Sequence, residues 1–314
     1  MQIVYPSSET RLPEVAACIG FFDGVHRGHR FLIGELIAES KRRGLASAVI
    51  TFRNHPRQLI DPDFCPQLIS SFDEKMEMLA ETGVDYCFVL DFTPALRNLT
   101  ACEFIHQILR KQVNASLLLI GYDHRFGKNR TDGFEDYQRY GAACGMEVMK
   151  EPDYSPSGMH VSSSAIRRAL KTGQPALAAH LLGEAYHLEG KVVAGSQIGR
   201  TIGFPTANVM PFDKTKIIPK NGVYAVFVQL GETMHPGMLN IGNRPTVDES
   251  EQISIEVNLL DFEGDLYGST LNIHFIEYLR EERKMESLDD LKQQLTTDRQ
   301  MVLDIIRKRK PMLR

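Results

Sequence analysis

The chain has 314 residues, of which 43% are hydrophobic and 24% charged; this is a globular composition that excludes a disordered or collagen-like chain. At this length we expect about two domains. With 36 Lys and Arg against 40 Asp and Glu, the formal charge of -4 excludes a general nucleic-acid binder but allows a local basic patch.

Neither the cysteines nor the apolar runs indicate secretion or a membrane. The five cysteines lie far apart and form no CxxC pair, so neither a zinc site nor a disulfide framework is predicted, and free thiols fit a reducing compartment. No apolar run approaches the ~20 residues of a membrane span, and residues 1–6 lack the charged and apolar regions of a signal peptide. We therefore expect a cytoplasmic protein without a membrane partner.

The N-terminal half alternates apolar runs with amphipathic segments. The predicted strands cover residues 15–22, 45–52, 84–90, 116–121 and 146–150. The predicted helices cover residues 28–43, 73–81, 100–112 and 133–144, and Gly44 is the expected stop of the first. This alternation predicts an α/β domain with a mostly parallel sheet covered on both faces, in which ligands bind at the carboxyl ends of the strands.

The sequence changes character near residue 182, after helices expected over 164–182. Frequent turn signals then predict a small antiparallel β-barrel; they lie at 221–222, 231–232, 242–243, 261–264 and 268. A final helix is predicted from a capping box and an apolar stripe that packs on the barrel, formed by Ser287 with Asp290 and by Leu288, Leu291, Leu295, Val302 and Ile305. We expect one domain over 1–183 and a second over 184–314.

The sharpest motif, G-F-F-D-G-V-H-R-G-H over residues 20–29, ends the first predicted strand and opens the first predicted helix. Unpaired amides at a helix start attract anions, and Gly24 and Gly28 allow a tight turn close to a phosphate. His26 and His29 are both able to donate to phosphate oxygens. An isolated HxxH favours surface histidines or a metal pair, but the strand–turn–helix context favours a phosphate site.

Two further loops at predicted strand or helix ends suit anions. Residues 121–130 offer three cations and the acid Asp123, with a solvated basic loop as the alternative. Residues 162–168 offer the hydroxyls of Ser163 and Ser164 and the guanidinium of Arg167, with a simple N-cap as the alternative. Three such loops on one sheet predict a polyphosphate site, while the absence of Walker A and GxGxxG patterns argues against a P-loop kinase or a dinucleotide dehydrogenase.

At these motifs the chain resembles the bacterial bifunctional riboflavin kinase/FAD synthetases, whose first domain is a Rossmann-like HxGH nucleotidyltransferase. The resemblance implies that FMN phosphate attacks the α-phosphorus of ATP and that pyrophosphate leaves. It implies catalytic roles for His26, His29 and Arg167 and ATP contacts at Gly20, Phe22, Gly24, His26, His29, Asp123, Ser163, Ser164 and Arg167. Departures at Phe21, His124, Ser164 and Gln174 concern the adenine and ribose contacts more than the reaction type.

The resemblance extends to residues 51–56 and to the second half. His55 is expected to line the flavin pocket, with a turn fixed by Pro56 as the alternative. The segment 199–208 resembles the family's glycine-rich loop and PTAN motif, which implies ATP binding by Gly199, Gly203, Thr206 and Asn208. Thr206 and Asn208 alternate on an extended segment, and the resemblance implies that they hold Mg²⁺ together with the ATP phosphates.

The run 253–260 alternates between two faces, with Glu256 and Asn258 on the polar one. The alternative is that Glu256 and Asn258 simply belong to an exposed polar face of the strand. The resemblance instead places at Glu256 the carboxylate that takes the proton from the ribityl hydroxyl of riboflavin, and it implies flavin contacts at Asn258 and Arg280. Arg280 is otherwise one charge in a solvated run.

These motifs predict a two-domain enzyme that makes FMN from riboflavin and then FAD from FMN, with ATP and Mg²⁺. Its partners are small molecules, without nucleic acid. One rival is a nucleotidyltransferase for another phosphorylated or pantetheine-like substrate, against which the PTAN segment argues; a class I aminoacyl-tRNA synthetase would need a KMSKS-like segment, which is absent. A non-catalytic flavin- or nucleotide-binding regulator is the other rival, although all the chemical residues named above are present.

Overall fold

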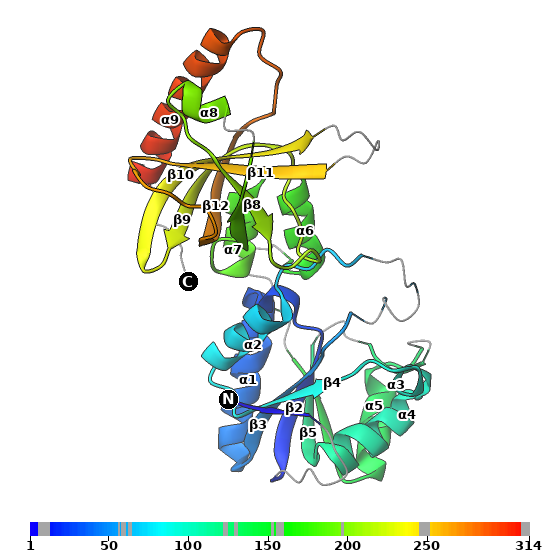
Figure 1. The fold of residues 1–314 in the computed structure, drawn as a ribbon. Helices are drawn as coiled ribbons and strands as arrows, with labels where there is room; N and C mark the ends of the chain where they lie inside the picture. The colour runs from blue at the N-terminus through cyan, green and yellow to red at the C-terminus, as the bar shows by residue number, and fades with distance from the viewer. Residues whose placement is uncertain are drawn as a thin grey trace. The chain divides into compact units, whose positions relative to one another are not determined.

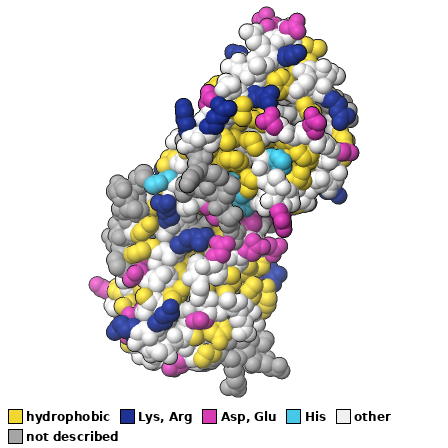
Figure 2. Space-filling model, turned by 90° about the vertical axis from the view of Figure 1, so that its left-hand side faces the viewer, with side chains coloured by type: hydrophobic (Ala, Val, Ile, Leu, Met, Phe, Trp, Pro, Cys, Tyr) yellow, Lys and Arg dark blue, Asp and Glu magenta, His cyan; other side chains and the backbone are white. Residues whose placement is uncertain are grey.

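The computed structural model describes residues 1–5, 13–55, 57, 61, 65–121, 125–128, 131–151, 154, 160–195, 198–244 and 252–308. The chain divides into two compact units, Met1–Ser162 and Ser163–Arg314. The first contains a sheet with helices on its faces and the second a barrel with helices outside it (Figure 1). On the face drawn in Figure 2, Lys and Arg are interspersed with Asp and Glu, in keeping with the nearly balanced charge.

The first unit is built on a six-stranded sheet in the order β1-β4-β3-β2-β5-β6, and every neighbouring pair is parallel. The strands are β1 (Gln2–Val4), β2 (Val15–Ile19), β3 (Ala46–Phe52), β4 (Tyr86–Leu90), β5 (Ala115–Ile120) and β6 (Glu147–Lys150). All five residues of β2 are buried, which explains why its sequence is continuously apolar. The parallel sheet is confirmed, and the edge strand β1 was not predicted.

Helices cover both faces of this sheet, as predicted. They are η1 (Asp23–Val25), α1 (Arg27–Arg43), α2 (Phe72–Glu81), α3 (Pro94–Asn98), α4 (Ala101–Glu103), η3 (Phe104–Gln112) and α5 (Phe134–Ala143). Leu36 of α1 and Leu79 of α2 share a buried cluster with Cys18 on one face. Ile105 and Tyr137 share another with Ala17 on the opposite face. The predicted helix over 100–112 is thus a short α-turn continued by a π-helix.

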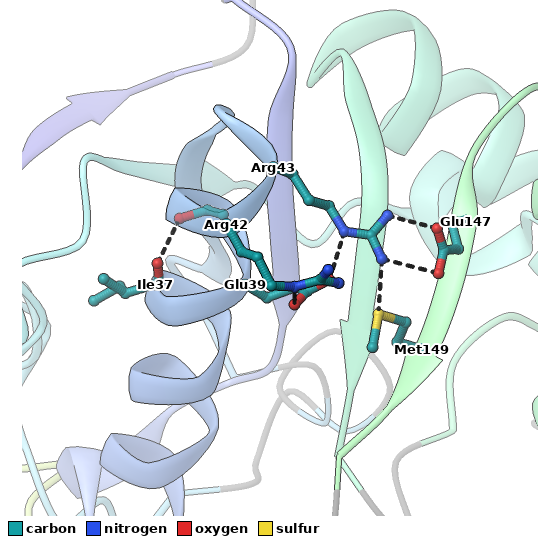
Figure 3. A network of polar contacts seen from close by, with 7 residues as sticks. Ile37, Glu39, Arg42, Arg43, Glu147 and Met149 are labelled. Carbon is teal, nitrogen blue, oxygen red and sulfur yellow. Dashed lines mark hydrogen bonds and ion pairs between the residues drawn. The ribbon is translucent and has the colours of Figure 1, made fainter.

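The end of α1 is tied to the edge strand β6 by Arg43 (Figure 3). Arg43 donates to Glu39 at 2.5 Å, to Glu147 at 2.5 and 3.0 Å and to the sulfur of Met149 at 3.4 Å. Gly44 then ends the helix in the left-handed conformation (φ 68°), which confirms the expected stop. Hydrogen bonds from Arg42 and Arg43 lower the pKa of Glu39 to about 2.

The second unit begins with two helices and continues as a closed antiparallel barrel in the order β10-β11-β8-β7-β12-β9. Its strands are β7 (His187–Val193), β8 (Ala207–Pro211), β9 (Gly222–Leu230), β10 (Thr233–Arg244), β11 (Gln252–Leu259) and β12 (Thr270–Arg280). Its helices are α6 (Ser163–Lys171), α7 (Pro175–Leu182), α8 (Ile198–Thr201) and α9 (Leu288–Lys308). The predicted barrel is therefore confirmed.

Helix α9 packs on the barrel, as predicted. Val302 is fully buried and clusters with Val223 of β9 and Met238 of β10, and the Ser287 hydroxyl accepts from the amide of Asp290 at 3.1 Å. The apolar stripe is shorter than expected because Leu288, at the first turn, is 58% exposed. Its inclusion in the packed stripe was wrong.

The boundary between the two compact units lies between Ser162 and Ser163. Helices α6 and α7 therefore belong to the same compact unit as the barrel. The functional boundary at 183/184 remains a prediction from the sequence. No helix in the described part of the chain combines the length and the apolar character that crossing a membrane requires.

Candidate active sites

The segment that follows β2 makes a tight turn at the carboxyl edge of the sheet. At the start of this segment the Gly20 amide donates to the Ile50 carbonyl at 3.0 Å, which is the last backbone hydrogen bond between this segment and β3. Phe22 (φ 55°) and Val25 (φ 34°) then adopt positive φ, a conformation that costs a non-glycine residue of order 1–3 kcal/mol unless its surroundings enforce it. Gly24 (φ 75°) adopts the same region freely.

Residues 69–71, just before α2, hold this turn in place. The Asp23 carboxylate accepts from the amides of Ile69 at 2.9 Å and Ser70 at 3.2 Å, and the Gly24 amide donates to the Ser70 hydroxyl at 3.0 Å. The ring of Phe22 is 1% exposed. Hydrogen bonds to Ile69 and Ser70 and the burial of Phe22 therefore fix the conformation of the turn.

The two motif histidines lie against each other at the start of α1. His26 is the N-cap residue, and its Nδ1 accepts from the His29 amide at 3.3 Å. The two rings stack with centroids 3.6 Å apart at 14°. Because Nδ1 of His26 accepts, a neutral His26 carries its proton on Nε2, where it is able to donate. A Cβ at Gly28 would lie 3.3 Å from the His26 ring and 3.5 Å from the Val161 carbonyl, so glycine permits this close approach.

The remaining predicted residues of the nucleotide site are divided between the two compact units. His55, after β3, contacts the Phe21 ring edge-on at 5.0 Å, and Gly20 and Phe22 belong to the turn itself. Ser163, Ser164 and Arg167 lie in the first turns of α6, within the second compact unit. Asp123 lies outside the described residues.

Sequence reasoning missed a buried lysine beside this turn. Lys75 of α2 is 3% exposed and donates to the carbonyls of Phe21 and Phe52. A signal for it existed, because Lys75 lies on the same helical stripe as Phe72, Met76 and Leu79, where an apolar residue is expected.

In the barrel, three polar side chains occupy one row across neighbouring strands. Glu256 of β11 is paired with Asn208 of β8 on one side and with Asn240 of β10 on the other. The Thr206 hydroxyl, just before β8, donates to the Glu256 carboxylate at 3.3 Å. The structure thus brings Thr206 and Asn208 of the PTAN segment next to Glu256, a proximity that the sequence did not predict.

The glycine-rich loop before β8 needs its glycines. A Cβ at Gly199 would lie 2.2 Å from the Phe204 carbonyl, and Gly203 has a φ of 84°. The loop is fastened from β11, where the Asn258 side chain donates to the Pro205 carbonyl at 2.7 Å. These contacts fix Thr206 relative to Glu256.

Two pockets meet at Thr206. The Glu256 pocket, about 320 Å³, is lined mainly by apolar side chains, and its polar lining residues are Thr206, Asn240, Glu256, Asn258, Arg280, Glu282 and Arg283. The Tyr267 pocket, about 80 Å³, is lined by Thr206, Arg200, Asp265 and Tyr267 among others. A mostly apolar pocket with a few convergent polar groups is typical of a small-molecule site.

Arg280 is held at the wall of the Glu256 pocket by α9. Its guanidinium donates to the carboxylate of Asp298 at 3.0, 3.1 and 2.7 Å, and Asp298 is fully buried. Gln294 donates to the same carboxylate at 2.8 Å. This ion pair was not foreseen from the sequence and couples the position of Arg280 to that of α9.

Comparison with known proteins gives two family matches that cover most of the chain. The FAD synthetase family matches residues 8–165, and the riboflavin kinase family matches residues 182–306. The chain is 42% identical over 281 residues to the bifunctional riboflavin kinase/FMN adenylyltransferase of Escherichia coli K12, covering 89% of each chain. It is 36% identical over 289 residues to the protein of that name from Bacillus subtilis 168, covering 90% of this chain and 89% of the other.

A solved structure shares the whole fold. A crystal structure titled as a macrolide-efflux protein from Streptococcus pneumoniae matches with a TM-score of 0.88 and 30% identity, covering 97% of this chain and 99% of the other.

Proposed function

The chain belongs to the family of bifunctional riboflavin kinases/FMN adenylyltransferases, and we propose which of its residues perform each reaction. It phosphorylates riboflavin to FMN with ATP and then transfers AMP from ATP to FMN, giving FAD and pyrophosphate. The two rival hypotheses, a nucleotidyltransferase for another substrate and a non-catalytic regulator, find no support in these matches. A cytoplasmic location remains a prediction from the sequence.

For the kinase reaction we assign riboflavin to the Glu256 pocket. Its apolar lining suits the flavin ring, and Asn258 and Arg280 on its walls supply polar contacts. The Glu256 carboxylate accepts the proton of the attacking ribityl hydroxyl. Thr206 orients that carboxylate through its hydrogen bond at 3.3 Å and lies on the wall shared with the Tyr267 pocket, from which the γ-phosphoryl group arrives.

The oxygen-bearing side chains around Glu256 suit Mg²⁺. Thr206 and Asn208 offer neutral oxygens, and Asn208 lies directly opposite Glu256 across the β8–β11 pair, so the donor set contains only the hard oxygen ligands that Mg²⁺ prefers. Bound there with the nucleotide, Mg²⁺ would neutralise charge on the ATP phosphates. The chain's own contribution is to hold the hydroxyl and the amide at a fixed distance from the carboxylate.

For the adenylyl transfer we assign the ATP polyphosphate to the turn of residues 20–29 and the start of α1. The start of α1 at Arg27 and Gly28 and the stacked His26 and His29 supply the donors proposed for the phosphate oxygens. FMN phosphate is itself the nucleophile, so the protein contributes positioning and charge stabilisation only. His55, against Phe21 at the next strand end, is assigned to the flavin side of this site.

Four further contacts to ATP are proposed from the motifs. Ser163 and Ser164 lie in the first turn of α6 and Arg167 follows one turn later, and the family resemblance assigns their hydroxyls and guanidinium to the triphosphate. Arg167 stabilises the charge that builds up at the α-phosphorus. Asp123 is proposed as a nucleotide contact on the family resemblance.

The contact between Thr206 and Glu256 at the meeting point of two pockets is the observation that carries the kinase assignment. The test is Glu256→Gln in the full chain, incubated with ATP and Mg²⁺ and either riboflavin or FMN. FMN formation should be lost while FAD still forms from supplied FMN, and Glu189→Gln, an exposed acid on β7, serves as the matched control. Unchanged FMN formation would contradict the role of Glu256.

A further inference from the structure

A lysine is buried behind the turn assigned to the polyphosphate. Lys75 lies in the first turn of α2 and is 3% exposed. Its ammonium donates to the Phe52 carbonyl at 2.9 Å, the Phe21 carbonyl at 3.2 Å and the Thr51 hydroxyl at 3.3 Å. All three acceptors lie at the carboxyl ends of β2 and β3, where the ladder between these strands stops.

The partners of this ammonium are neutral. Within the described residues no carboxylate forms an ion pair with Lys75, and Asp23 acts on it only through space. A buried charge without a counterion is costly, and proteins usually retain one only where it is used. Burial accordingly lowers the pKa of Lys75 to about 8, against the opposing effect of Asp23.

An aromatic layer lies next to Lys75. The ammonium is 4.4 Å from the centroid of the Phe21 ring and 5.5 Å from that of Phe72. The Phe21 ring in turn contacts His55, and both of these side chains are partly exposed whereas Lys75 is not. The positive charge therefore sits one layer behind residues at the edge of the sheet where ligands bind.

We propose that Lys75 is a positioning residue for adenylyl transfer, which holds the Phe21 carbonyl and thereby fixes the turn that presents His26 and His29. The proposal rests on the assignment of ATP to this turn. Phe22 and Val25 adopt positive φ, which the surroundings must enforce. The turn is held by Ser70 at the Gly24 amide, and by Lys75 together with the Thr51 hydroxyl at the Phe21 carbonyl. The charge of the ammonium also favours the phosphates that gather in front of it.

Lys75→Met tests this role, because it keeps the length of the side chain and removes the donor and the charge. Adenylyl transfer should fall on the order of ten-fold or more in kcat, as expected for loss of hydrogen bonds from a charged group. Phosphorylation of riboflavin, measured on the same molecules, should stay at the wild-type rate. Lys111→Met, an exposed lysine on η3, is the matched control and should leave both rates unchanged.

The pH profile separates positioning from mere stability. In the wild type, adenylyl transfer should decline above about pH 8 as Lys75 loses its proton, and Lys75→Met should abolish this alkaline limb. The charged and titratable groups that act on Lys75 are Asp23 and Cys87. Burial raises the pKa of Cys87 to about 12, so this thiol does not account for a limb near pH 8.

Thr51→Val provides a second test that leaves the lysine in place; it also removes the hydrogen bond that the Thr51 hydroxyl donates to the Phe21 carbonyl at 3.1 Å, so its readout is the position of the alkaline limb and not the rate. Loss of one acceptor for the ammonium should disfavour its charged form, so the alkaline limb should move to lower pH. Hydrogen exchange of β2 and β5 peptides reports whether the first unit is folded in each variant.

A folded Lys75→Met protein with wild-type adenylyl kinetics and an unchanged alkaline limb would overturn the proposal. If Lys75→Met does not fold, an unchanged limb in Thr51→Val would overturn it instead. If His26→Ala makes FAD at the wild-type rate, it is the assignment of ATP to the turn that fails rather than the role of Lys75.

Discussion

The ion pair between Arg280 and Asp298 gives the sharpest prediction for the kinase half. Asp298→Asn keeps the size of the side chain but removes the negative charge that three hydrogen bonds from Arg280 and one from Gln294 converge on. Breaking one member of a fully buried pair typically costs ~3–5 kcal/mol. Since the Arg280 side chain is 22% exposed and retains some water, we expect about 2–3 kcal/mol.

Hydrogen exchange is the suitable assay, because it reports the local stability of α9 without interference from the other unit. A loss of 2–3 kcal/mol corresponds to exchange about 30- to 150-fold faster in α9 peptides. The KM for riboflavin should rise about ten-fold, because Leu291 and Leu295 of α9 and Arg280 all line the Glu256 pocket, and FAD formation from supplied FMN should not change.

A paired substitution separates stability from flavin binding. Arg280→Met combined with Asp298→Leu replaces the ion pair by apolar side chains, which often restores or raises stability. Exchange of α9 should then return toward the wild-type rate while the KM for riboflavin stays high, because Arg280 is gone. Wild-type exchange together with a wild-type KM in Asp298→Asn would refute the reasoning.

Two further predictions concern the barrel. Gly199→Ala would place a Cβ 2.2 Å from the Phe204 carbonyl, so it should distort the glycine-rich loop and lower riboflavin phosphorylation at least ten-fold, with FAD formation from FMN as the internal control; an unchanged kinase rate would contradict this. His274 is 2% exposed, neither ring nitrogen has a hydrogen-bond partner in the described part of the chain, and burial, with His187 and Lys216 nearby, lowers its pKa to about 4. As pH falls below about 6.5, His274 takes up a proton in the unfolded chain before it does so in the folded one, so the barrel should lose up to about 3 kcal/mol of stability by pH 4. His274→Leu should make the stability measured by urea titration depend less on pH. An equally steep loss in the variant would contradict this role of His274.

The elements that could be read from the sequence are those whose signal is local. The continuous apolar run of β2 reflects its burial on both faces. Gly44 ends α1 because of its positive φ, and residues 253–260 alternate with the period of a strand. The edge strand β1 has only three residues, and the wider i→i+5 turn of the π-helix η3 extends over only nine, so neither leaves a distinct pattern in the sequence. Leu288 fits the apolar stripe but lies beyond the part of α9 that contacts the barrel.

The candidate sites were predictable in part for the same reason. His26 with His29 and Thr206 with Asn208 stand close together in sequence, whereas Arg280 and Asp298 meet only because α9 folds back on β12. One signal connects the residues that were missed. Lys75 lies among Phe72, Met76 and Leu79, and Asp298 lies between Leu295 and Val302, so each places a charge in the apolar stripe of a helix.

Such a charge must find a partner inside the fold, because an isolated buried charge is too costly. In this chain the partners lie at the proposed sites: Lys75 donates to the Phe21 carbonyl within the turn of residues 20–29, and Asp298 accepts from Arg280 on the wall of the Glu256 pocket. A charged residue on an otherwise apolar helical stripe is therefore a useful signal for residues that position a site.

Two separate sites are proposed to act in succession on one flavin, and a complementation experiment tests this proposal. Glu256→Gln alone should leave riboflavin unconverted, and His29→Ala alone should accumulate FMN without FAD. An equimolar mixture of the two, given riboflavin, ATP and Mg²⁺ and analysed by chromatography of the flavins, should make FAD again, because FMN made by one protein is adenylylated by the other. A mixture of folded variants that still makes no FAD, or a single variant that has lost both activities, would contradict the account.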